Sequence, residues 1–290
     1  MHVAILSSTT GWHIDELTRA VRARGLEPLV LPWEGNVSPV GHGGGVTNAG
    51  HTLAGVRAVL PRIIPSGSLE QIIYRVDTLH RLEEDGIRVM NTARAIERTV
   101  DKSWTSAILA RGGLPTPETI VCEQPDDAFA AWRALGGDVI VKPLFGSMGL
   151  GMSRVSDEDL AWRVFRVVET VRGIYYIQRF IPHEGRDIRA FVVGGKVLGA
   201  MERTAPGWRT NFSRGGKTAP VELPAAWAEL AVRAAALVGA EYAGVDLLPG
   251  ADGKVYVLEV NGIPGWEGLQ QATGIDVAGA VIDQLLRGTA

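Results

Sequence analysis

The stretch V-D-L-L-P-G-A-D-G-K-V-Y-V-L-E-V-N, residues 245 to 261, carries the strongest structural pattern in the chain. Two apolar runs flank a turn rich in proline, glycine and aspartate at positions 249 to 253. This arrangement is typical of a β-hairpin. The second strand is expected to cover Val255 to Val260, with a glutamate inside it and an asparagine directly after it.

The polar residues of this hairpin form a candidate metal site. Because strand side chains alternate between faces, Glu259 and Asn261 are expected on one face, together with Val255 and Val257. Asp246 in the first strand could project onto the same face. Two carboxylates and an amide oxygen suit Mg²⁺, which prefers hard oxygen ligands. The alternative is an edge hairpin with ordinary solvated acids.

Length, composition and charge limit the classes of protein to consider. With 290 residues the chain is long enough for about two domains. Its 46% hydrophobic and 21% charged content is typical of a soluble globular protein. A net charge of −3 provides no general attraction for nucleic acid or a membrane surface, and no run is long enough to span a bilayer. Cys122 is the single cysteine, which excludes an internal disulfide, and we expect a cytoplasmic protein.

The first third of the chain has the pattern of an α/β domain. A strand at Val3–Leu6, a helix through Ile14–Val21 and a strand at Leu29–Leu31 resemble the start of a doubly wound sheet. The G-x-G-x-x-G fingerprint is absent, which disfavours a dinucleotide site. Residues 35–52 are expected to form a mobile glycine-rich loop, and Leu69–Glu84 a long helix.

The middle of the chain contains a candidate phosphate-binding loop. A strand at Val139–Lys142 is followed by the loop G-S-M-G-L-G at 146–151 and a second strand at Met152–Val155. This is not the strand-loop-helix of a Walker P-loop. The glycines would let backbone N–H groups approach a triphosphate closely, although a simple hairpin tip explains the same pattern.

Further strands and charged residues follow. Residues 175–182 are expected to form a strand leaving the sheet. Asp187 and Arg189 share a face of the next strand and could bind ribose and phosphate, or form a surface ion pair. The basic turn at 203–217 is better suited to clamp phosphates than nucleic acid, because the chain is acidic overall. Residues 265–273 are expected to form a loop before a closing helix.

The order of these motifs resembles that of ATP-grasp ligases, specifically the RimK-type α-L-glutamate ligases. The motifs are Lys102, V-K-P with its glycine loop, Q-R-F-I-P, D-I-R, R-T-N and L-E-V-N-G-I-P-G. The resemblance implies an α/β fold that becomes α+β in its C-terminal half. It implies an N-terminal doubly wound domain at 1–95, a small central domain at 96–180 and a C-terminal antiparallel-sheet domain at 181–290, with ATP between the last two.

The resemblance also assigns roles to residues. Catalytic roles fall to Arg189, Arg203 and Arg209, and two Mg²⁺ ions (or Mn²⁺) would bind Asp246, Glu259 and Asn261. The substrate residues are Arg62, Ser66, Arg214 and Gly262. ATP would be contacted by Lys102, Lys142, Gly146, Ser147, Met148, Gly149, Gln178, Arg179, Phe180, Ile181, Asp187, Arg209, Thr210 and Asn211.

The chain departs from the family pattern at two places. The adenine hinge usually reads Q-E-Y or Q-E-F, whereas this chain has Arg179 at its centre, so any acidic role there is lost. The family's N-x-S-P-G is Asn261–Gly265, N-G-I-P-G, here. The run at 68–83 looks more like the branch that glutamylates tetrahydromethanopterin-type C1 carriers than like ribosomal-protein modifiers.

The expected reaction is therefore ATP-dependent carboxylate–amine ligation through an acyl-phosphate. The partners would be ATP, L-glutamate and a small carboxylate-bearing acceptor, in a homo-oligomeric enzyme (a dimer or tetramer) without nucleic-acid or membrane contacts. The alternatives are the same chemistry on a protein or peptide, such as a ribosomal protein or an amino-acid carrier protein, and a non-catalytic nucleotide-binding regulator. An NAD-dependent oxidoreductase is disfavoured by the missing fingerprint.

Overall fold

A computed structural model describes residues 1–41, 44–146, 149–209 and 217–289. The N-terminal part contains a parallel sheet in the order β2-β1-β6, formed by Glu27–Leu31, His2–Leu6 and Ala58–Pro61. Helix α1 (Trp12–Arg22) packs on one face, and α2 (Leu69–Glu84) and α3 (Ala93–Val100) on the other. Helices on both faces of a parallel sheet confirm the doubly wound prediction.

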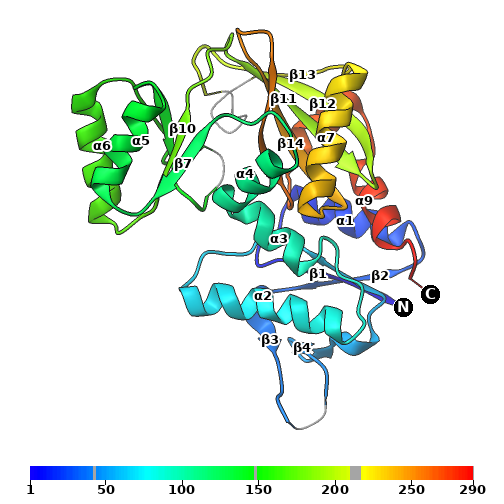
Figure 1. Cartoon of the computed structure of the whole chain (residues 1–290). Helices are drawn as coiled ribbons and strands as arrows, with labels where there is room; N and C mark the ends of the chain where they lie inside the picture. The colour runs from blue at the N-terminus through cyan, green and yellow to red at the C-terminus, as the bar shows by residue number, and fades with distance from the viewer. Residues whose placement is uncertain (42–43, 147–148, 210–216, 290) are drawn as a thin grey trace.

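The C-terminal helix α9 (Val277–Leu285) completes this N-terminal layer. Val281 and Ile282 share a hydrophobic core with Val3 and Ile5 of β1. The two ends of the chain therefore lie close together (Figure 1). The expected domain boundary at residue 95 falls inside α3, and the division into 1–95, 96–180 and 181–290 stays a prediction.

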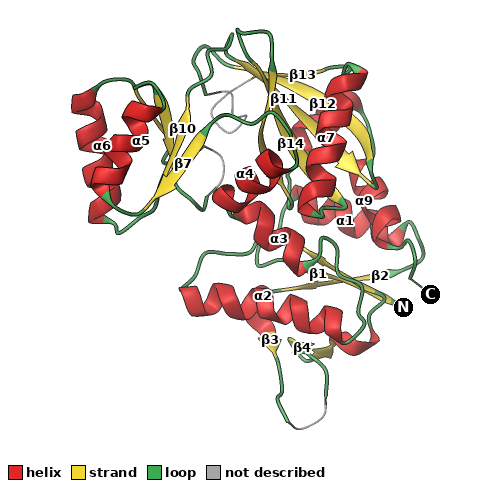
Figure 2. Cartoon of the chain, viewed as in Figure 1, coloured by secondary structure: helices red, strands yellow, loops and turns green. Residues whose placement is uncertain are grey.

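The central part is a four-stranded antiparallel sheet with two helices on one face (Figure 2). Strand β10 lies between β7 and β8, so the prediction that residues 175–182 form a strand leaving the sheet is wrong. The four strands, in spatial order, are β7 (Thr119–Cys122), β10 (Tyr175–Arg179), β8 (Val139–Lys142) and β9 (Ser153–Val155), and the helices are α5 (Pro125–Ala134) and α6 (Glu158–Thr170).

The C-terminal part is a five-stranded antiparallel sheet. One face packs on α7 (Ala225–Val238) and α4 (Lys102–Arg111), and part of the other packs on α8 (Glu267–Thr273) and α9. The strands, in spatial order, are β13 (Lys217–Pro220), β12 (Lys196–Thr204), β11 (Arg186–Val193), β14 (Tyr242–Pro249) and β15 (Val255–Asn261). The remainder of the second face points toward the central sheet.

A bulge in the β14–β15 hairpin decides which way its acids point. Asp246 pairs with Glu259, whereas Leu247 pairs with Val257, so Leu258 is an extra residue in β15. Val257 and Val260 both join the core against α7. The prediction that Glu259 shares a face with Val257 is therefore wrong, because a bulge shifts the alternation of side chains by one residue.

Two further expectations are corrected. Residues 265–273 form α8 rather than a loop. The segment 35–52 contains a small antiparallel sheet of β3 (Asn36–Val37), β4 (Thr47–Asn48) and β5 (His51–Thr52), held by the buried hydrogen bond from Asn48 Nδ2 to Asn36 Oδ1. This small sheet depends on a bond between two side-chain amides, and hydrophobic periodicity in the sequence does not reveal such a bond.

Along the described parts of the chain, no helix combines the length and apolar character needed to cross a membrane.

Candidate active site

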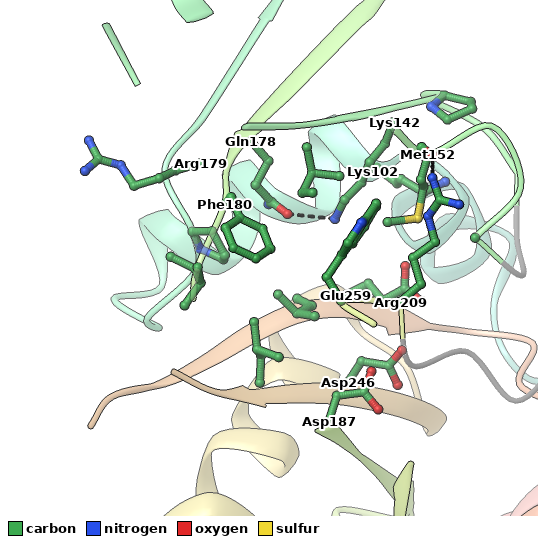
Figure 3. A pocket seen from close by; sticks show the side chains of 18 of the residues that line it. Lys102, Lys142, Met152, Gln178, Arg179, Phe180, Asp187, Arg209, Asp246 and Glu259 are labelled. Carbon is green, nitrogen blue, oxygen red and sulfur yellow. Dashed lines mark hydrogen bonds between the residues drawn. The ribbon is translucent and has the colours of Figure 1, made fainter. Parts of the chain in front are cut away.

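A cavity lies between the central sheet and the C-terminal sheet (Figure 3). Strands β8 and β10 and the loop after β8 contribute its upper wall, and β14 and β15 contribute its floor. The predicted residues that line it are Lys102, Lys142, Gly146, Gly149, Gln178, Arg179, Phe180, Ile181, Asp187, Arg209, Asp246 and Glu259. Residues 147, 148, 210, 211 and 214, also predicted to act here, lie outside the described part of the chain.

Two lysines line the cavity, one from a strand and one from a helix. Lys142, at the end of β8, is buried and donates a hydrogen bond to Gln178 Oε1 at 2.7 Å. Lys102, at the start of α4, donates to the carbonyl of Gly146 at 2.7 Å. Burial lowers the pKa of both ammonium groups, and the charge of Glu259 partly opposes this effect. An anion in the cavity would stabilise their charged forms.

Gln178 is held by a network that the sequence pattern did not reveal. Its Nε2 donates to Thr119 Oγ1 and to the Tyr176 hydroxyl, both at 3.0 Å. The Tyr176 hydroxyl also lies 2.7 Å from Ser106 Oγ. Since both ends of the amide are engaged, the position of the Lys142 ammonium is defined by β10 and α4 together.

The backbone N–H groups at the centre of the hinge are engaged by neighbouring segments. The N–H of Arg179 donates to Glu118 O, and that of Phe180 donates to Asp138 O. The Arg179 side chain points away from the cavity and pairs with Glu118 (Figure 3). Ile181 is the next residue and also lines the cavity. Arginine in place of the usual hinge glutamate therefore leaves the cavity unobstructed.

A buried ion network forms the floor. Asp246 receives two hydrogen bonds from Arg189, both at 2.7 Å, and an ion pair from Arg203 at 2.8 Å. Arg203 also binds Asp187 through two 2.7 Å bonds. Burial opposes ionisation of Asp246, but the two guanidinium groups outweigh it and hold its carboxyl pKa below the usual range. The surface ion-pair interpretation of Asp187 and Arg189 is wrong, because Asp187 is buried and its partner is Arg203.

Glu259 and Asn261 offer the more accessible oxygens. The side chain of Glu259 is 34% exposed, and Arg189 Nη2 lies 3.7 Å from its Oε1. Asn261 Nδ2 donates to Glu259 Oε1 at 3.1 Å and to Gly244 O at 3.3 Å, which orients its amide oxygen away from these partners. Among the described residues, no group of three or more His, Cys, Asp or Glu could hold a metal, and the amide oxygen of Asn261 adds a neutral donor beside the carboxylate of Glu259. A carboxylate and an amide oxygen fit Mg²⁺.

The predicted substrate residues are distributed over different places. Gly262 lines a second cavity that adjoins the first and shares Lys102, Lys142 and Glu259 with it. Arg62 lies on a separate cavity in the N-terminal part, and Ser66 is exposed in the loop after β6. Phe145, Met152, His183 and Trp208 line the first cavity without having been predicted, since apolar and aromatic lining has no distinctive sequence pattern.

The arrangement matches a known family. The model of the RimK-like ATP-grasp domain matches residues 99–285. The tetrahydromethanopterin:α-L-glutamate ligase of Methanosarcina acetivorans is 36% identical over 262 residues, covering 80% of this chain and 81% of the relative. The enzyme of the same name from Methanococcus maripaludis is 31% identical and covers 99% of this chain and 98% of the relative.

Solved structures agree with this assignment. The ATP-grasp ligase PsnB, complexed with a minimal precursor, superposes with a TM-score of 0.78 at 26% identity and covers 98% of both chains. Another PsnB structure, with Mg and ADP, is 25% identical and also has a TM-score of 0.78. The chain therefore belongs to the RimK-like ATP-grasp family.

Proposed function

We propose that this chain joins the amino group of L-glutamate to a carboxylate of a small cofactor, of the tetrahydromethanopterin type, with ATP converted to ADP and phosphate. The observation that supports this most is the cavity in which Lys102 and Lys142 face the carboxylates of Asp246 and Glu259. The acceptor class rests on the relatives in two methanogens, both named for that pterin.

In the proposed reaction, a carboxylate oxygen of the acceptor attacks the γ-phosphorus of ATP and ADP leaves. The amine of glutamate then attacks the acyl carbon, and phosphate leaves as the amide forms. Lys102, Lys142 and Arg209 would hold phosphate oxygens, and this positioning is the main contribution of the protein to phosphoryl transfer. No side chain has to form a covalent bond.

Asp246, Glu259 and Asn261 would hold Mg²⁺ (Mn²⁺ could substitute), and the ion would offset charge on the phosphate oxygens. Arg189 and Arg203 orient Asp246 through its two oxygens. Asp187 would reach the ribose, and the backbone at Ile181 the adenine, since both residues line the same cavity. The charge of a bound nucleotide would also favour the protonated form of buried Lys142.

The decisive experiment is mass spectrometry of pterin cofactors incubated with the enzyme, ATP, Mg²⁺ and L-glutamate. We expect a gain of one or more glutamyl units on the carboxylate-bearing cofactor, together with one ADP for each glutamyl unit added. A control without glutamate should show no mass gain. If no cofactor gains mass but ADP is released with a peptide acceptor, the acceptor assignment is wrong.

A peptide or protein acceptor is the second candidate. It is supported by PsnB, which covers 98% of this chain and has a precursor bound in its structure. Phosphate release on adding glutamate with either acceptor separates both possibilities from a regulator that only binds nucleotide.

A further inference from the structure

A pair of buried hydroxyl groups lies beside the two adjoining cavities. Tyr176 of β10 and Ser106 of α4 both line the second cavity, and their oxygens are 2.7 Å apart. Neither residue lines the first cavity, whereas Gln178 does and Lys142 lines both. The hydroxyl pair therefore adjoins a lysine of the expected phosphate site without facing the nucleotide.

Strand register brings these side chains together. Tyr176 pairs directly with Lys142 across β10 and β8, so both side chains lie on one face of the central sheet. Gln178 is two residues further along β10 and therefore lies on the same face. Tyr175 points to the opposite face, where its hydroxyl donates to Phe165 O at 3.0 Å in the core under α5 and α6. Two successive tyrosines of one strand thus have different surroundings.

The available donors and acceptors define the orientation of the Gln178 amide. A lysine ammonium can only donate, so the oxygen Oε1 has to face Lys142, at 2.7 Å (Figure 3). The two protons of Nε2 then go to the hydroxyls of Thr119 and Tyr176, each at 3.0 Å. Thr119 can accept, because it donates its own proton to a backbone carbonyl. Tyr176 also accepts from the amide, and Ser106 Oγ lies within reach of its own proton.

The Tyr176 hydroxyl opposes rotation of this amide. If the amide of Gln178 turned over, its Nε2 would face the ammonium of Lys142, and two donors would meet. Lys142 is buried, and a buried cation that loses its acceptor is costly. The ring of Tyr176 makes a separate contact, since Lys142 Nζ lies 5.7 Å from its centroid. Tyr176 therefore acts on Lys142 both through the amide and through its ring.

We propose that Tyr176 is a positioning residue for the nucleotide: its hydroxyl holds the Gln178 amide in the orientation that directs the Lys142 ammonium at the phosphates. This inference rests on the proposed function, because it requires Lys142 to contact ATP. The affinity for ATP then depends on a side chain that does not line the first cavity.

Two tyrosine variants form a matched pair for the test. Tyr176→Phe removes the hydroxyl and keeps the ring. Tyr175→Phe makes the same change on the same strand, where both tyrosines are 1% exposed and both hydroxyls are hydrogen-bonded. Calorimetry with ATP and Mg²⁺, without acceptor or glutamate, measures the Kd. We expect the Kd to rise about 3- to 10-fold in Tyr176→Phe, the usual effect of one hydrogen bond, and to stay at the wild-type value in Tyr175→Phe.

A double-mutant cycle tests whether Tyr176 acts through Gln178. Gln178→Met keeps a side chain of similar length and removes its hydrogen bonds, so it should raise the Kd for ATP at least as much as Tyr176→Phe. Adding Tyr176→Phe to Gln178→Met should not raise the Kd further, because the hydroxyl then has no amide to hold. Urea unfolding of all variants measures their stability separately from the Kd.

The outcomes separate this inference from the proposed function. Equal Kd values for ATP in the two tyrosine variants would overturn the role of Tyr176. A further rise when Tyr176→Phe is added to Gln178→Met would overturn it as well. If the wild type does not bind ATP with Mg²⁺, the nucleotide site and this inference both fail. If the Kd values are as expected but no acceptor gains glutamate, the proposed function fails and the role of Tyr176 stands.

Discussion

At the scale of single residues, Asp246 and Glu259 differ although they pair across β14 and β15. Asp246 is buried and bound by two arginines. Glu259 is partly exposed, and its ion pair with Arg189 is longer, at 3.7 Å. The first carboxylate supports the fold of the cavity floor, and the second contributes little to it. Both would be needed for a metal ion.

We predict that Asp246→Asn lowers the free energy of unfolding by roughly 3 kcal/mol, because two buried arginines lose their charged partner. Glu259→Gln should change it by less than about 1 kcal/mol, since exposed pairs contribute little. Both variants should lose ADP formation. Urea unfolding and an ADP assay measure the two quantities. Wild-type turnover in Glu259→Gln would exclude the metal assignment.

The stability that Asp246 contributes through its two arginines depends on pH in a defined way. The pKa of Asp246 is lowered in the folded state, so its stabilising effect is complete above the ordinary aspartate pKa of about 3.9. The effect is lost only as the pH falls through the lower folded-state value. The stability difference between wild type and Asp246→Asn should therefore be constant from pH 7 to about pH 5 and decrease in stronger acid. A difference that disappears near neutral pH would contradict the buried ion network.

At the scale of elements, the junction between α3 and the end of β15 explains why the motif N-G-I-P-G has a glycine at position 262. A Cβ at Gly262 would lie 2.3 Å from Thr99 Oγ1, closer than atoms can approach. The carbonyl of Gly262 accepts a hydrogen bond from Asn91 Nδ2 at 2.6 Å, so this segment cannot move away without losing that contact. Close packing is thus a structural reason for glycine at a position that also lines the second cavity.

We predict that Gly262→Ala destabilises the protein by about 1–3 kcal/mol, the usual cost of overpacking. Combining it with Thr99→Ala should recover part of the loss, because the nearest clashing atom is removed. Thermal unfolding of the two single variants and the double variant gives the coupling energy. Strict additivity of the two effects would show that Thr99 is not the obstacle.

At the scale of the whole molecule, the fold joins its two ends. Helix α9 packs on α1 and shares a core with β1, more than 270 residues earlier in the chain. Arg24 extends this contact through an ion pair with Asp283 at 2.6 Å. The N-terminal sheet is therefore completed by a C-terminal element. A homo-oligomeric state stays a prediction.

Removing residues 277–290 should therefore unfold the N-terminal sheet. Val277, Val281, Ile282 and Leu285 are fully buried, and each such side chain contributes about 1.5–3 kcal/mol. Their sum is comparable to the total stability of a domain, about 5–15 kcal/mol. Hydrogen exchange at β1 should become fast in this truncation and remain slow in a control that lacks only residues 288–290. Slow exchange in both would mean that the N-terminal part folds independently.

By itself, the sequence determined the family, the doubly wound start and the identity of most cavity residues, including Lys102, Lys142 and Glu259. These features depend on local periodicity and on the order of short motifs, which a linear chain records directly. The tertiary structure alone decided that Leu258 turns Glu259 toward the cavity, that Arg189 and Arg203 enclose Asp246, and that Arg62 lies on a cavity of its own. Those features arise from strand register and from packing between distant segments, where no local pattern specifies which partner a side chain will meet.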